Sequence, residues 1–108
     1  ILYELNTSGR MIFAQGYEYE GQPIILTEYG GIAFESPDRE AWGYNGAVKD
    51  VQSFINRYSS ITNAIRKTKY LRGYCYTQLT DVMQEVNGLM TADRRLKVPL
   101  DEIKKVNK

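Results

Sequence analysis

The feature that most constrains this chain is an apolar run that ends in a carboxylate and two glycines, with the sequence PIILTEYGG at residues 23–31. A proline suits the first position of a strand, where no backbone donor is needed. The mostly apolar and β-branched residues after it are typical of a strand buried on both faces of a parallel sheet. The run therefore predicts a strand over residues 23–28, which Gly30 and Gly31 end by allowing a sharp turn.

Glu28 stands at the carboxyl end of this predicted strand. In parallel α/β folds, ligands bind and chemistry takes place at this end of the strands. A carboxylate buried there is costly unless it is hydrogen-bonded or used. Glu28 is therefore interpreted either as a catalytic carboxylate or as a structural residue that marks the strand end and points to solvent.

Composition excludes several classes of function. The 108 residues fit one small domain, and a net charge of +1 gives no field that would attract nucleic acid or an anionic membrane. A single cysteine, Cys75, excludes an internal disulfide framework and a cysteine-based zinc site, and the chain has no histidine. No membrane span, metal or cofactor is expected, so acid–base chemistry falls to carboxylates, tyrosine or lysine.

Between residues 47 and 69 the apolar period changes to that of a helix. Apolar residues recur there at spacings of three and four, as on one face of a helix. They are Val48, Val51, Phe54, Ile55, Tyr58, Ile61, Ala64 and Ile65. We expect one long amphipathic helix over this range.

A second strand is predicted over residues 71–79, followed by a polar loop at 82–99 and a short helix at 101–108. A strand, a helix and a strand in this order form a parallel βαβ unit. Such a unit brings Glu28 to the same edge of the sheet as Gln78 and Asp81. Two strands leave open sheet edges, which demand partners.

These motifs resemble glycoside hydrolase family 2, which holds enzymes of the β-galactosidase and β-glucuronidase type. PIILTEYGG is similar to the seventh barrel strand of that family, which carries the nucleophilic glutamate. GYCYTQLTDV at residues 73–82, with QEVNGL at 84–89, is similar to the eighth strand and the loop after it. The resemblance runs from about Arg10 to Asn107.

The resemblance implies that residues 1–108 are a C-terminal fragment of a (β/α)8 TIM barrel, an α/β fold, with strands 7 and 8 and their connecting and terminal helices. It implies a retaining glycosidase that hydrolyses terminal O-glycosidic bonds, with Glu28 as the nucleophile. The acid/base glutamate of the family lies in an Asn-Glu pair, which this sequence lacks. The fragment is therefore expected to be inactive alone and to need the remainder of the barrel.

Further residues are candidates for binding the carbohydrate substrate. Trp42 lies in the loop after the first strand, where it either stacks on a sugar or only covers the barrel rim. Gln78 and Asp81 lie where they could hydrogen-bond substrate hydroxyls, although Asp81 would equally suit a structural cap. Tyr29 is expected to face away from Glu28 and to pack, and Cys75 to be a small buried hydrophobe.

The alternative to an enzyme fragment is a non-catalytic module that binds carbohydrate or protein. A carboxylate at a buried strand exit favours the enzyme, and so does a sheet that does not close on itself. Exposed apolar edges predict self-association into homo-oligomers. The chain begins at Ile1 without an initiator Met or a secretion signal, so we expect a piece of a longer protein and make no prediction of its localisation.

Overall fold

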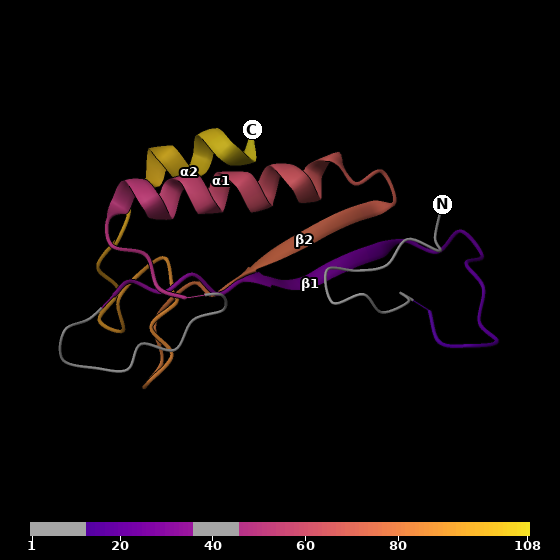
Figure 1. The fold of residues 1–108 in the computed structure, drawn as a ribbon, viewed down its shortest axis with the longest axis horizontal. Coiled ribbons are helices and arrows are strands. Elements are labelled where there is room, and N and C mark those ends of the chain that lie inside the picture. Colours follow the sequence, from indigo (N-terminus) through magenta and orange to yellow (C-terminus); the bar gives the residue numbers. More distant parts are fainter. Residues whose placement is uncertain (1–12, 36–45) are drawn as a thin grey trace.

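The computed structural model describes residues 13–35 and 46–108. In these residues β1 (Ile24–Gly30), α1 (Val51–Lys67), β2 (Leu71–Thr77) and α2 (Leu100–Asn107) follow one another along the chain. The two strands form one parallel sheet, and both helices lie on the same side of it (Figure 1). The parallel pairing expected from the strand–helix–strand order is confirmed.

The sheet register brings the ends of both strands to one edge. Ile24 pairs with Leu71 at the start of the strands, and Gly30 pairs with Thr77 at their end. Two irregularities interrupt the pairing, one between Ile24 and Ile25 and one between Leu26 and Tyr29. An irregularity of this kind changes which residues face each side of a sheet.

The start of α1 is fixed by Asp50, whose carboxylate Oδ1 accepts a hydrogen bond from the backbone N–H of Ser53 at 2.7 Å. This bond satisfies one of the free donors of the first turn and lowers the pKa of the Asp50 carboxyl. The predicted helix therefore begins four residues later than expected. Arg66 and Lys67 lie in the last turn, where cations complement the helix dipole.

The C-terminal helix α2 is tied to α1 and β2 by polar side chains. The Nδ2 of Asn107 donates to the Tyr58 hydroxyl at 2.7 Å, and its Oδ1 accepts from the Tyr74 hydroxyl at 3.0 Å. Arg66 of α1 donates to the backbone oxygens of Val106 and Lys108 at 2.7 and 2.9 Å. These bonds use carbonyls that the end of a helix leaves unpaired.

The apolar core lies between the sheet and the helices and extends under the loops that follow the strands. Its buried members come from both helices and from the segments that precede or follow them: Ile32, Val48, Phe54, Ile55, Tyr58, Val98 and Ile103. Tyr76 of β2 packs against them. The described helices contain no segment long and apolar enough to cross a membrane.

The expected fold class, a TIM-barrel fragment with strands 7 and 8, is wrong. The described chain forms a small open sheet of two parallel strands with two helices on one side. The sequence pattern predicted the strands, the helices and the parallel pairing correctly. A βαβ pattern occurs in every parallel α/β fold, however, and does not by itself specify a closed barrel.

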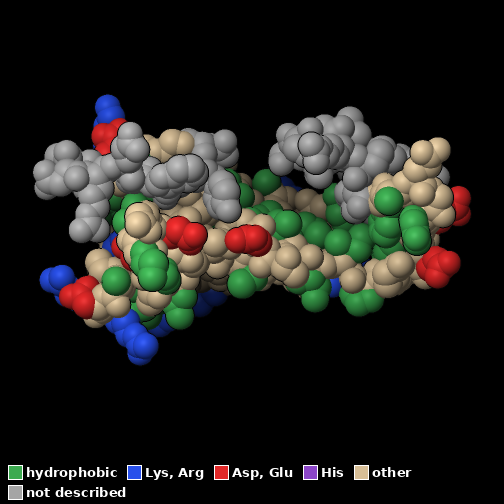
Figure 2. All heavy atoms as spheres, turned by 90° about the horizontal axis from the view of Figure 1, so that it is seen from below, with side chains coloured by type: hydrophobic (Ala, Val, Ile, Leu, Met, Phe, Trp, Pro, Cys, Tyr) green, Lys and Arg blue, Asp and Glu red, His purple; other side chains and the backbone are tan. Residues whose placement is uncertain are grey.

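Burial of β1 on both faces is also not observed. Ile25 is 57% exposed, and the sheet face opposite the helices is uncovered in the described residues. Figure 2 shows this side of the molecule, where apolar side chains and carboxylates are both accessible. Cys75, expected to be buried, is exposed. Both expectations assumed a second covering layer, which two strands do not provide.

Gly30 is required by the close approach of β1 to β2. Its φ is +100°, and an added Cβ would lie 2.2 Å from a Tyr76 ring carbon. We expect Gly30→Ala to lower the free energy of unfolding by about 3–5 kcal/mol, from backbone strain together with overpacking. Gly16→Ala is the matched control, since Gly16 has a φ of +89° but no atom within 4 Å of the added Cβ. Urea unfolding that gives the two variants equal stability would contradict this account.

The open sheet predicts self-association. Within the described residues each strand has one edge without a partner strand, and β1 contains neither lysine nor proline to protect that edge. We expect sedimentation velocity to show oligomers whose fraction rises with concentration. Ile25→Lys should reduce that fraction, whereas Val51→Lys, an equal change of charge on α1, should not. A single monomeric species at all concentrations would refute the prediction.

Candidate functional site

Glu28 lies near the carboxyl end of β1, just before the paired residues Tyr29 and Tyr76. Its side chain is exposed, and so is that of Thr27, because the pairing is irregular at this point. No residue in the described ranges forms a hydrogen bond or ion pair with the Glu28 carboxylate. Tyr29 packs toward the helices, so the neighbouring Glu28 projects toward the uncovered face.

The three residues after Glu28 are held tightly. The Tyr29 hydroxyl is hydrogen-bonded to Thr62 Oγ1 at 2.9 Å, and Thr62 is fully buried in α1. Gly30 lies against the Tyr76 ring, and the N–H of Gly31 donates to the Thr77 carbonyl at 2.8 Å. The prediction that Tyr29 packs and faces away from Glu28 is therefore confirmed.

Tyr76 connects the end of β1 with the loop after β2. Its hydroxyl accepts from the N–H of Ile32 at 3.4 Å and donates to the carbonyl of Asn87 at 3.3 Å. Its ring lies edge-on to Tyr29 and Tyr58, with centroids 5.5 and 5.2 Å away. Burial raises the pKa of both Tyr76 and Tyr29, so these hydroxyls stay protonated into the alkaline range.

Asp81 stabilises the loop after β2 through a partly buried ion pair. Its Oδ1 lies 2.6 Å from Lys97 Nζ and accepts from the N–H of Gly88 at 2.8 Å. The same ammonium donates to the Val86 carbonyl at 2.8 Å. The side chains of Lys97 and Asp81 are only 12% and 13% exposed. This geometry agrees with the structural role that the sequence allowed for Asp81. A role of Asp81 in substrate binding stays a prediction.

Gln78 directly follows the last residue of β2, at the same edge of the sheet as Glu28. The peptide bond between Thr77 and Gln78 is cis. The Nε2 of Gln78 donates to the Glu85 carbonyl at 3.4 Å, and the side chain is half-buried. Trp42, the remaining candidate for substrate binding, lies outside the described residues.

One residue that organises this loop, Lys97, is not marked by any pattern in the sequence. Lys97 stands 16 positions from Asp81, and no local pattern relates two residues so far apart in a loop. Asn87 is 6% exposed, and its Oδ1 has no hydrogen-bond partner in the described chain. A Cβ on Gly88 would lie 2.4 Å from the backbone of Thr80, so the loop packs closely on itself.

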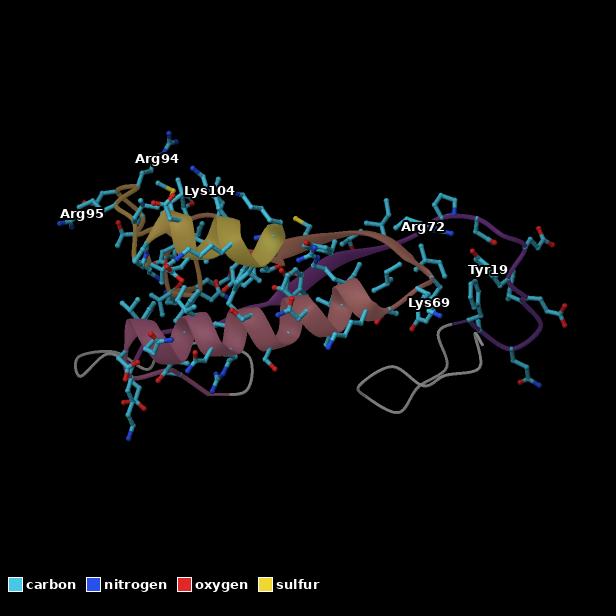
Figure 3. The ribbon with its side chains drawn as sticks, turned by 90° about the horizontal axis from the view of Figure 1, so that it is seen from above. Tyr19, Lys69, Arg72, Arg94, Arg95 and Lys104 are labelled. Atoms are coloured by element: carbon cyan, nitrogen blue, oxygen red, sulfur yellow. The ribbon has the colours of Figure 1, made fainter. Side chains whose placement is uncertain are left out.

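An open cavity of about 500 Å³ lies beside the loop, lined by Phe34, Thr91, Arg95, Leu96 and Lys97. The contacts of its lining residues do not indicate a ligand. The Phe34 ring stacks on Phe54 at 5.2 Å, and the two cations are paired with Asp93 and Asp81. Arg94 and Arg95 project outward at one end of the molecule (Figure 3).

No group of three or more metal-binding side chains gathers in the described residues. A comparison with protein-family models found none that matches the chain, and a comparison with curated proteins found no match either. The resemblance to glycoside hydrolase family 2 therefore rests on the two motifs, and the activity that it implies remains a prediction.

The Asp81–Lys97 pair gives a prediction about stability. Lys97→Met leaves the partly buried Asp81 carboxylate without its counter-ion, and we expect a loss of about 3 kcal/mol in the free energy of unfolding, the lower end of the range for buried pairs. Adding Asp81→Asn should recover part of that loss, because an amide oxygen still accepts from Gly88. Lys105→Met, which removes the exposed pair with Glu102, is the control and should have no measurable effect. Equal denaturation midpoints for Lys97→Met and Lys105→Met would contradict the prediction.

Proposed function

We propose that this chain supplies the nucleophile of a retaining glycosidase, similar to β-galactosidase, that hydrolyses terminal O-glycosidic bonds. One observation carries the proposal: the Glu28 carboxylate is exposed at the carboxyl end of a parallel strand, with no partner in the described residues. The three residues that follow it are held by packing and hydrogen bonds. A free carboxylate on such a support at this edge suits attack on a bound substrate.

The chemistry requires two carboxyl groups about 5–5.5 Å apart. A Glu28 carboxylate oxygen attacks the anomeric carbon and forms an ester bond, while the bond to the leaving oxygen breaks and that oxygen takes the electron pair. An acid protonates the leaving oxygen, and the same residue, now a base, later activates water. The acid/base residue comes from a polypeptide segment other than this sequence, so the chain alone does not turn over ordinary glycosides.

Substrate binding is proposed for Gln78, Asp81 and Trp42. Gln78 adjoins the strand end and presents an amide, which can both donate to and accept from a sugar hydroxyl. Asp81 already uses Oδ1 for Lys97 and Gly88, so a sugar hydroxyl would have to use its second oxygen. The aromatic ring of Trp42 suits the apolar face of a sugar.

A non-catalytic module that binds carbohydrate or protein is the second candidate. An exposed carboxylate has no desolvation cost and needs no catalytic reason to be kept, so the exposure of Glu28 is compatible with this module as well as with an enzyme. The two candidates differ in one property: only the enzyme forms a covalent bond between Glu28 and a sugar.

The test uses 2,4-dinitrophenyl 2-deoxy-2-fluoro-β-glycosides of gluco, galacto and manno configuration. Dinitrophenolate leaves without protonation, so the missing acid is not needed for the first step, and the adduct accumulates because no base hydrolyses it. We expect intact mass to rise by one fluoroglycosyl group, with peptide mapping placing it on Glu28. Glu28→Gln should abolish the adduct, whereas Glu85→Gln, a change at a nearby exposed carboxylate, should not.

Absence of any adduct, with sugar binding still detectable by NMR titration, would favour the binding module. In the complete enzyme we expect Glu28→Gln to abolish turnover with little loss of substrate binding. Turnover retained by that variant would place the nucleophile elsewhere.

A further inference from the structure

Of the two residues adjacent to Glu28, only one is buried. Before Glu28, Thr27 is exposed and the pairing with β2 is irregular between Leu26 and Tyr29. Leu26, two residues before, is half-buried and pairs with Tyr74. The adjacent residue that packs is therefore Tyr29.

Tyr29 is held by both its ring and its hydroxyl. The ring packs edge-on against Tyr74 and Tyr76 of β2, with centroids 5.7 and 5.5 Å away. The hydroxyl reaches across to α1, where Thr62 is 0% exposed and provides a hydrogen-bond partner at 2.9 Å. A hydroxyl left without a hydrogen bond in this apolar layer would lower the stability of the fold. The Tyr29–Thr62 bond therefore favours the one strand position in which both hydroxyls are paired.

We propose that Tyr29 is a positioning residue for Glu28, acting through its hydrogen bond to Thr62. Adjacent side chains of a strand point to opposite faces, so holding Tyr29 against α1 directs Glu28 to the uncovered face. A shift of the strand by one residue would exchange the two side chains and turn the carboxylate inward. The proposal rests on the proposed function, and it names the contact that orients the nucleophile.

The test compares Tyr29→Phe, Thr62→Val and the double variant with Tyr74→Phe. Tyr74→Phe is the matched control, because it removes a hydroxyl from the same aromatic cluster but loses a bond to Asn107 instead. The first readout is the rate of fluoroglycosyl labelling of Glu28 against reagent concentration. We expect Tyr29→Phe to lower the maximal rate about tenfold at an unchanged half-saturating concentration. Tyr74→Phe should change neither.

The double variant separates positioning from simple stability. Replacing both hydroxyls leaves neither one unpaired, so we expect the melting temperature to recover toward that of the unaltered chain. Labelling should stay slow, because the contact that orients the strand is still missing. Labelling that recovers together with the melting temperature would overturn the proposal, and so would an unchanged rate in Tyr29→Phe.

A second readout keeps this inference separate from the proposed function. If the unaltered chain is never labelled at Glu28, the proposed function fails, and amide hydrogen exchange decides the positioning role alone. We then expect the Gly31 amide, which donates to the Thr77 carbonyl, to exchange about tenfold faster in Tyr29→Phe and in the double variant, relative to the Phe54 amide, and unchanged in Tyr74→Phe. Equal protection of Gly31 in all variants would overturn the inference.

Discussion

The described structure depends on the placement of Tyr76. Its ring is in contact with Gly30 of β1 and lies edge-on to Phe54 and Tyr58 of α1. Its hydroxyl joins the N–H of Ile32 to the carbonyl of Asn87. One side chain thus fixes the spacing of the strands, the position of the helix and the start of the loop. A smaller residue would leave buried polar groups unpaired as well as a cavity.

Much of the local structure could be predicted from the sequence. The three- and four-residue spacing predicted a helix, which the structure forms at Val51–Lys67. The ends of the second strand and of the terminal helix lie within two residues of the predicted ends. The direction of Tyr29 followed from strand alternation. These features depend on neighbours along the chain, which a sequence displays directly.

Other features depend on contacts between distant residues, and the sequence did not predict them. The Asp81–Lys97 pair, the Tyr29–Thr62 bond and the buried Asn87 all arise from folding. The barrel expectation failed for a related reason, since closure of a sheet depends on strands beyond the two described here. The exposure of Glu28 has the same origin, because no second layer covers that face in the described residues.

The ion pair that joins Asp81 to Lys97 has a consequence for variation in the loop between them. The pair joins the two ends of the loop. Asp81 also accepts from the N–H of Gly88, and Lys97 also donates to the carbonyl of Val86. The exposed side chains of Met83 and Arg94 lie between the two charges and take no part in this ion pair. Because the entropy of closing a loop rises only with the logarithm of its length, insertions at those positions cost little. The surface of this loop is thus free to diversify, while the strand ends beneath it keep their shape.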